Sequence, residues 1–442
     1  MAKAGSKEAF IPGSDTDCEE IFRYPYTIDD NTLDYLKNHG RIMFIIRGVA
    51  GTGKESLSQI LSSEERYPGA VVCSADNYFK DTFSTAKRDQ NSLKKSHEYC
   101  KNRVEIACKK GVHPIVIKNT HVKRFEVQNY FNLAAEFDYT IIIASTMGKF
   151  KVTPEILAKS NTKGLNVEYF RHRLKQWQDI FPILTGWFLS PLDSSYFLNI
   201  VQTALDCLLG DGKFCRILNC FDKGKLLGHY KAKRSLYCVA ACSKKNSCFD
   251  IKNHYQSVLV REHYGECFSL TILGLLVTPS NIFAIVYLDD IMKQLHESDD
   301  FTIVASEEDN IENILDMESL YISPNIKNNF TTYNQNCPFK AGSSGKRASL
   351  EAWGQDESID VKCCSCIHLA EAKDVEGTFP WANKRKFHAL LASVADSNGI
   401  ISIDKFGELE DGYRFCRLRN NAWIIRHPMK ISFKSVFTGM YT

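Results

Sequence analysis

The feature that most constrains this chain is an unbroken apolar run that leads directly into a glycine-rich loop. Residues 42–46 read Ile-Met-Phe-Ile-Ile, and residues 48–56 read Gly-Val-Ala-Gly-Thr-Gly-Lys-Glu-Ser. A run without polar positions is typical of a parallel strand that helices cover on both faces. Similar runs recur at 70–73, 114–117 and 139–144, and stretches with helical spacing separate them. This alternation predicts an α/β fold with a parallel sheet.

The glycine-rich loop has the spacing of a Walker A motif, with Gly48, Gly53 and Lys54 at the defining positions. Glycines let backbone N–H groups turn toward phosphate oxygens, the lysine adds a positive charge, and the following helix points its positive end at the anion. The competing interpretation is a turn that only joins a strand to a helix. The strand before it and the helix after it favour phosphate binding, so the loop could hold the phosphates of ATP or GTP.

One position of the loop departs from the motif. Glu55 stands where a Ser or Thr would supply the hydroxyl that holds Mg²⁺, and Ser56 comes one place too late. A carboxylate there would repel a polyphosphate or contact a metal differently. The sequence therefore favours nucleotide binding over hydrolysis or phosphoryl transfer, and it argues against a bound magnesium ion.

Polar residues also follow the next strands at the same edge of the predicted sheet. Asp76, in Ser74-Ala-Asp76, could act as a base or contact a metal beside the phosphate loop, or it could only cap a helix. For Asn119-Thr120-His121 the favoured interpretation is ordinary turn polarity. The basic cluster at 171–175 could close over phosphates, although exposed helix charge is favoured. The residues predicted to bind the nucleotide are Gly48, Gly51, Thr52, Gly53, Lys54, Ser56 and Asp76.

The second half of the chain has a different pattern. From about residue 236 to residue 439, strand-like runs are separated by turns, with helical stretches between some of them, which predicts an α+β fold. The expected divisions are a leader at 1–20, a P-loop domain at 21–210, a linker at 211–230 and a second domain at 231–442 with a long loop at about 325–346.

Composition bounds the partners and the compartment. The 55 basic and 52 acidic residues leave a net charge of +3, so any binding to nucleic acid requires a local patch. Sixteen cysteines, with no apolar segment at the N-terminus, predict reduced thiols in the cytoplasm. The longest dense apolar stretch, 270–277, is too short for a transmembrane helix.

Taken in order, these residues resemble the 2′,3′-cyclic-nucleotide 3′-phosphodiesterase family. Its members pair an N-terminal polynucleotide-kinase-like P-loop domain with a C-terminal two-histidine phosphoesterase domain. The combination of the Walker loop with Gly186-Trp-Phe-Leu189, Leu270-Thr-Ile272 and Phe437-Thr-Gly439 is more specific than the loop alone. The similar stretches are 44–54, 74–76, 119–121, 181–189, 268–279, 374–376 and 437–441.

The resemblance implies a phosphoric diester hydrolase that converts nucleoside or RNA 2′,3′-cyclic phosphates to 2′-phosphates. Such enzymes carry two His-x-Thr motifs on adjacent strands: one histidine is the general base, the other the general acid, and the threonines hold the phosphate. That scheme requires no cofactor or metal. Nucleotides and RNA ends are the implied partners. The chain ends Gly439-Met-Tyr-Thr442 without a prenylation box, so no lipid anchor is expected.

The first motif is degenerate, because Tyr237 stands for the histidine and Val239 for the threonine. Tyrosine, with an ordinary pKa near 10, is a poor base at neutral pH, and valine offers no hydrogen bond.

The second motif best matches residues 364–370. One register puts Cys366 at the histidine and His368 at the threonine; a shift by two makes His368 the histidine and leaves Ala370 at the threonine. Residues 347–351 are another candidate, without a histidine. His296-Glu-Ser298 is the only His-x-Ser in the chain, and it lies outside both expected strands.

These departures leave His368 as the remaining candidate catalytic histidine, although a strand residue that fills the core is the favoured interpretation. A metal site at Cys364, Cys366 and His368 is a minor alternative, because no second ligand pair completes it. The expected activity is a weak or lost cyclic phosphodiesterase. The alternatives are a degenerate protein that binds nucleotides, RNA ends or a partner, and a kinase-type enzyme, which Glu55 disfavours.

Overall fold

The computed structural model describes residues 22–81, 89–147, 153–161, 163–218, 222–243, 251–296, 349–352, 358–373, 390–391, 395, 397–402, 405–418 and 421–442. The predicted leader, the predicted loop at 325–346 and the similar stretch at 374–376 lie outside these residues. Within the described segments no helix is long and apolar enough to cross a membrane.

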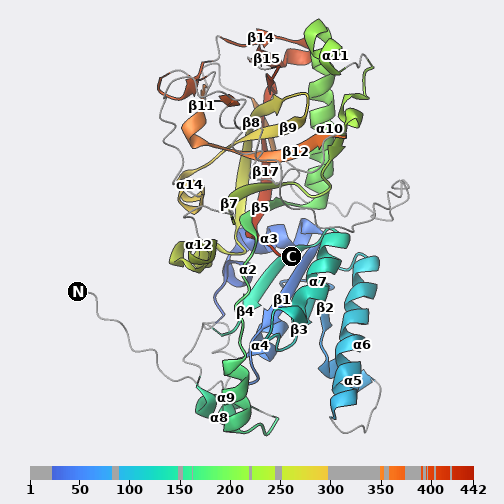
Figure 1. Cartoon of the computed structure of the whole chain (residues 1–442), viewed down its shortest axis with the longest axis vertical. Coiled ribbons are helices and arrows are strands. Elements are labelled where there is room, and N and C mark those ends of the chain that lie inside the picture. Colours follow the sequence, from blue (N-terminus) through green and yellow to red (C-terminus); the bar gives the residue numbers. More distant parts are fainter. Residues whose placement is uncertain are drawn as a thin grey trace, which may run out of the picture.

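Four parallel strands form the first sheet, in the order β2–β3–β1–β4, seen in the lower half of Figure 1. Met43 of β1 pairs with Ile115 of β3 on one side and with Ile141 of β4 on the other. The predicted parallel sheet is thereby confirmed. The strands are β1 Ile42–Arg47, β2 Val71–Cys73, β3 Ile115–Lys118 and β4 Thr140–Ser145.

Helices cover both faces of this sheet because successive side chains of the fully buried β1 point to opposite sides. Phe44 packs in a cluster with α3 and α4, whereas Met43 packs in a cluster with α6 and α7. The helices of this part are α2 Pro25–Ile28, α3 Asp30–His39, α4 Lys54–Ile60, α5 Asp76–Asp81, α6 Gln90–Lys109, α7 Phe125–Glu136, α8 Pro154–Ser160 and α9 Val167–Lys175.

The second sheet is antiparallel and barrel-like, and it occupies the upper half of Figure 1. Its order is β10–β17–β5–β7–β12–β9–β8–β16–β15–β14, β6 pairs with β12, and a β17–β8 pairing closes part of it on itself. The strands are β5 Leu184–Leu189, β6 Tyr230–Ala232, β7 Tyr237–Cys242, β8 Cys267–Val277, β9 Asn281–Tyr287, β10 Ser349–Ala352, β12 Cys364–Ala372, β14 Gly407–Glu408, β15 Arg414–Arg417, β16 Trp423–Arg426 and β17 Met429–Met440, with β11 Ile359–Asp360 and β13 Ile400–Ile401 as a separate pair.

Helix α10 lies against this sheet, and Phe197 and Val201 share its core with Phe433. The other helices of the C-terminal part are shorter. Helix α10 spans Pro191–Cys207, and the shorter helices are α11 Gly212–Leu218, α12 Ile251–Gln256, α13 Val258–His263 and α14 Asp290–Leu295. Single 3₁₀ turns lie at Leu208–Gly210, Leu226–His229, Val361–Cys363 and Glu410–Gly412.

The pairing of β5 differs from the expected division of the chain at residue 210. Gly186 pairs with Val239 of β7 and with Thr438 of β17, so β5 lies in the antiparallel sheet. A Cβ on Gly186 would lie 2.2 Å from the carbonyl oxygen of Cys238, which explains the glycine. The expected linker is partly helical as well: the Phe214 ring of α11 packs against Trp423 in the core of this sheet.

The outer edge of β4 is covered by side chains from distant parts of the chain. Thr438 Oγ1 donates a hydrogen bond of 2.7 Å to Ile141 O, and Tyr24 OH donates one of 2.7 Å to Ser145 O. Between them, Ile143 N donates to Tyr264 OH at 3.1 Å. These bonds satisfy backbone groups that an edge strand would otherwise leave unpaired, and they join the two sheets.

We expect Thr438→Val to lower the free energy of unfolding by about 1–3 kcal/mol, because it leaves the buried carbonyl of Ile141 without its donor. Urea unfolding measures the change. Thr203→Val, the same substitution on the exposed face of α10, is the control and should alter stability by a few tenths of a kcal/mol at most. A Thr438→Val protein as stable as the wild type would show that the contact at the β4 edge is not needed.

Candidate functional site

The loop between β1 and α4 is built to expose its backbone at the carboxyl edge of the parallel sheet. Gly51 and Gly53 have φ angles of 84° and 77°, in the left-handed region that favours glycine. A Cβ on Gly48 would lie 2.0 Å from Thr146 Oγ1 and 2.5 Å from Thr52 Oγ1. The three glycines are therefore required by conformation or by close packing, as a phosphate-binding loop requires.

Lys54 begins α4 and folds back over the loop, where its Nζ donates a hydrogen bond of 2.7 Å to Val49 O. Thr52 Oγ1 donates to the same carbonyl at 2.8 Å and lies 2.6 Å from Thr146 Oγ1. Burial, aided by the nearby charge of Lys163, lowers the pKa of Lys54 to about 7. An anion in the loop would favour the protonated form of this lysine.

Glu55 is neutralised by a cation that the sequence analysis did not single out. Lys118, the last residue of β3, forms an ion pair with the Glu55 carboxylate. The carboxylate at the usual metal-ligand position is thus directed to a lysine. In the described parts of the chain, no group of three or more His, Cys, Asp and Glu side chains is placed to hold a metal ion. Glu55 therefore does not supply the hydroxyl that holds Mg²⁺ in the usual motif.

Asp76 lies at the start of α5, and its Oδ2 forms an ion pair of 2.8 Å with Nζ of Lys163. Lys163 comes from the segment between α8 and α9, and Ser160 Oγ of α8 donates to Gly51 O at 3.4 Å. The α8–α9 segment therefore packs over the phosphate loop from the end of the molecule seen at the bottom of Figure 1. Sequence reasoning missed Lys118 and Lys163 because each meets its partner only in the folded chain.

The basic cluster at 171–175 contacts acidic and aromatic side chains of α8 and α9. Arg171 forms ion pairs with Glu168 and, at 3.5 Å, with Glu155. The guanidinium of Arg173 lies 5.5 Å from the ring centroid of Tyr169. These contacts fit the favoured interpretation, exposed helix charge.

The turn after β3 holds the loop in place. The Asn119 side chain accepts a hydrogen bond of 2.9 Å from Ala75 N, and Gly48 N donates to Thr120 O at 3.2 Å. His121 has a φ of 48° and its carbonyl accepts from Arg47 Nε at 3.0 Å. Burial lowers the pKa of His121 to about 3, so its ring is neutral at physiological pH. These residues support the site.

The pairing of β7 with β12 shows how the two degenerate motifs face each other. Cys238 pairs with Ile367 in an antiparallel ladder, which places Tyr237 across from His368 and Val239 across from Cys366. The competing candidate at 347–351 contributes β10, which pairs with β17 and not with β7. Strand adjacency therefore favours residues 366–368 as the counterpart of 237–239.

His368 is buried, and its Nε2 donates to Asn281 Oδ1 at 3.1 Å. Burial, with the charge of Lys233 nearby, lowers the pKa of His368 to about 3. Burial raises the pKa of Tyr237 to about 12, and Lys233 Nζ lies 5.3 Å from the centroid of its ring. Both pKa values are shifted away from neutral pH, whereas acid–base catalysis is favoured by a pKa near the working pH.

His296 follows α14 and is brought to β12, although the sequence analysis placed it outside both motif strands. Its Nε2 lies 3.3 Å from Ser365 Oγ, and both residues are buried. Side chains alternate along a strand, so Ser365 faces away from the side of β12 that carries Cys366 and His368. Ser298 lies outside the described residues.

Comparisons with known proteins agree with this arrangement. A family model described as an AAA domain matches residues 43–163. The chain is 27% identical over 290 residues to 2′,3′-cyclic-nucleotide 3′-phosphodiesterase of Rattus norvegicus, covering 63% of this chain and 67% of that protein. It is 25% identical over 310 residues to the protein of the same name from Mus musculus, covering 68% and 70%.

The chain is similar to the 2′,3′-cyclic-nucleotide 3′-phosphodiesterases, and these matches support a divergent protein of that kind. Among solved structures, a chain of the Pnkp1/Rnl/Hen1 RNA repair complex matches at 15% identity with a TM-score of 0.26. That match covers 31% of this chain and 43% of the other, which is too little to support an argument. Compared with the expected motifs, this chain keeps the glycines and the lysine of the loop, has Glu55 directly after them, and has altered residues at both histidine motifs.

We expect the binding of a phosphate in this loop to be accompanied by proton uptake. A bound anion raises the pKa of Lys54 from about 7 toward its ordinary value, so the lysine gains a proton near pH 7.5. For the same reason, the affinity due to this residue should fall as the pH rises above about 7. Calorimetry with ATP in two buffers of different ionisation enthalpy measures the uptake.

Lys54→Arg is the control for this prediction, because a guanidinium keeps its charge throughout this pH range. It should bind with less proton uptake than the wild type. Equal uptake by the two proteins would mean that another group titrates.

Proposed function

We propose that this protein binds the phosphate of a nucleotide or of an RNA end in the loop at 48–54 without a magnesium ion. We further propose that the cyclic phosphodiesterase activity implied by its family is weak or lost. The ion pair between Glu55 and Lys118 is the observation that carries the first proposal. The protonation behaviour of Tyr237 and His368 carries the second.

Three features support phosphate binding. The glycines at 48, 51 and 53 leave the backbone N–H groups of the loop accessible. Burial lowers the pKa of Lys54, so a bound anion would favour its protonated, positively charged form. Lys163 places a further cation at the same edge, where Asp76 balances it. Charge-assisted hydrogen bonds from such groups to phosphate are about twice as strong as neutral ones.

The pair at Glu55 supports metal-free binding. In the usual motif a hydroxyl at this position holds Mg²⁺, which shields the charge of the phosphates. Here the position carries a carboxylate whose charge Lys118 already compensates. The cations near the loop, and not a metal, would then balance a bound phosphate. Phosphoryl transfer, which depends on the metal in P-loop enzymes, is disfavoured for the same reason.

The second sheet supports the weak or lost hydrolysis. General acid–base catalysis works best when the catalytic pKa lies near the working pH, and a positioned acid or base contributes about 100-fold to 10,000-fold. The pKa values of Tyr237 and His368 lie far from the working pH, and Val239 has no hydroxyl that could bind the phosphate. The alternative is that hydrolysis persists through His368, which family resemblance favours.

The metal-free proposal predicts that ATP and a 5′-phosphorylated RNA bind equally well with Mg²⁺ and with EDTA. Glu55→Ser restores the hydroxyl of the usual motif, so binding by this variant should become stronger when Mg²⁺ is added. Glu65→Ser, an exposed change outside the loop, should behave as the wild type. Calorimetry measures all three.

Lys54→Ala should weaken binding about tenfold or more in either buffer, because it removes a charge-assisted contact. Wild-type binding that disappears in EDTA would refute metal-free recognition. Binding of ATP and RNA that is the same in wild type and Lys54→Ala would refute the phosphate site itself.

A further inference from the structure

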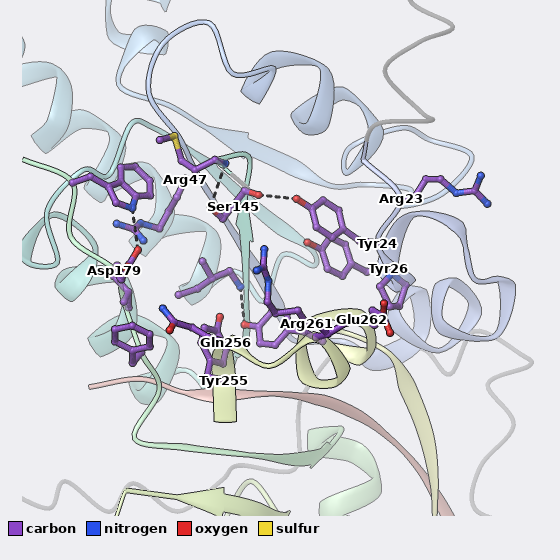
Figure 2. A pocket seen from close by; sticks show the side chains of 18 residues that line it. Arg23, Tyr24, Tyr26, Arg47, Ser145, Asp179, Tyr255, Gln256, Arg261 and Glu262 are labelled. Atoms are coloured by element: carbon purple, nitrogen blue, oxygen red, sulfur yellow. Dashed lines mark hydrogen bonds between the residues drawn. The ribbon is translucent and has the colours of Figure 1, made fainter. Parts of the chain in front are cut away.

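A cavity of about 630 Å³ lies between the parallel sheet and the C-terminal part (Figure 2). Neither Tyr237 nor His368 lines it. The ends of β1 and β4 contribute Arg47 and Ser145 to its wall, and α12 and α13 contribute Tyr255 and Arg261. The segment before α2 supplies Tyr24, whose hydroxyl also seals the edge of β4. The wall is therefore made by three parts of the chain that are distant in sequence.

Aromatic rings form much of this wall. The rings of Tyr24 and Tyr26 stack with their centroids 4.9 Å apart. The rings of Phe181 and Tyr255 meet edge to face with their centroids 6.2 Å apart, and Trp177 also lines the cavity. Flat aromatic surfaces of this kind are the usual platforms for nucleobases in single-stranded RNA and in free nucleotides.

The side chain of Arg47 is buried in the wall and held by hydrogen bonds. It is 4% exposed, its Nε donates to His121 O at 3.0 Å and its terminal nitrogen to Gln178 O at 2.8 Å. Its guanidinium lies 4.4 Å from the ring centroid of Trp177, and the Trp177 Nε1 donates to Asp179 at 3.1 Å. This network fixes a cation and an aromatic ring side by side.

Arg261 supplies a second cation that the fold leaves available. It is exposed and has no ion-pair partner among the residues that the structure describes. Figure 2 shows its side chain rising from α13 toward Tyr24. With Arg23, the cavity carries three arginines against two carboxylates, those of Asp179 and Glu262. Guanidinium groups of this kind match the geometry of phosphate.

We infer that this cavity binds one nucleotide unit, an aromatic base together with its phosphate, from single-stranded RNA or from a free nucleotide. Its volume lies within the range of about 300–1,000 Å³ that is typical of ligand sites. The base would lie among the rings, and Arg261 would contact the phosphate. The site is separate from the loop at 48–54, and it does not rest on the function proposed for that loop.

The test uses a fluorescent five-nucleotide RNA with free hydroxyls at both ends, so that no terminal phosphate is offered to the glycine loop. Anisotropy titrations at several salt concentrations give its affinity. Arg261→Ala should weaken binding roughly tenfold and reduce the salt slope by about 1, because one phosphate contact is lost. Phe181→Ala, which removes a ring from the wall, should also weaken it.

Two controls separate this site from other effects. Arg216→Ala removes an exposed arginine on α11, outside the cavity, and should leave the affinity unchanged. Lys54→Ala is measured beside it: an RNA affinity that falls with Lys54→Ala but not with Arg261→Ala would place the RNA in the loop and contradict the inference. If the loop proposal is wrong, the affinity for ATP will instead be the same in the wild type and in Lys54→Ala.

The outcomes decide the inference and the source of the ligand. If AMP binds with the same dependence on Arg261 while the RNA does not bind, the ligand is a free nucleotide. If both bind, the cavity takes a strand as well. If neither binds to the wild type, or if Arg261→Ala and Phe181→Ala both bind as the wild type does, the cavity is only a gap between packed parts and the inference is wrong.

Discussion

The arrangement of this molecule depends on how the open edge of β4 is covered. A parallel sheet that ends in an edge strand leaves backbone groups unpaired, and burying them without partners would cost several kcal/mol in total. Thr438, Tyr264 and Tyr24 supply those partners. Because the three come from β17, from the end of α13 and from the segment before α2, this one edge brings together the parts of the chain that line the cavity between the sheets.

We propose that local pairing and burial weaken the reactive chemistry at both motif sites. At the glycine loop, the carboxylate of Glu55 is compensated by Lys118, and the charge of Lys54 is suppressed by burial. At the β7–β12 pair, burial moves the pKa values of Tyr237 and His368 away from neutrality in opposite directions. In this proposal, the first change still permits the binding of an anion, whereas the second disfavours the proton transfer that hydrolysis of a cyclic phosphate requires.

The sequence allowed the local features to be predicted and left the long-range ones open. The strand at 42–46 and the loop after it were predictable because an apolar run, glycines and a lysine act within about a dozen residues. The place of β5 was not, since a buried run does not show which sheet it joins; only its pairing with β7 and β17 does. Likewise, Lys118 and Lys163 meet their acidic partners across 63 and 87 residues. Contacts over such distances leave no periodic pattern in the sequence.

The claim that the acid–base pair is lost is tested most directly by steady-state turnover of 2′,3′-cyclic NADP. The purified chain would be compared with the similar protein from Rattus norvegicus in the same assay. Loss of an acid–base pair predicts a kcat/KM at least about 100-fold lower than that of the relative across pH 5–8. A kcat/KM comparable to that of the relative would contradict the account, and its survival in His368→Ala would show that other residues perform the chemistry.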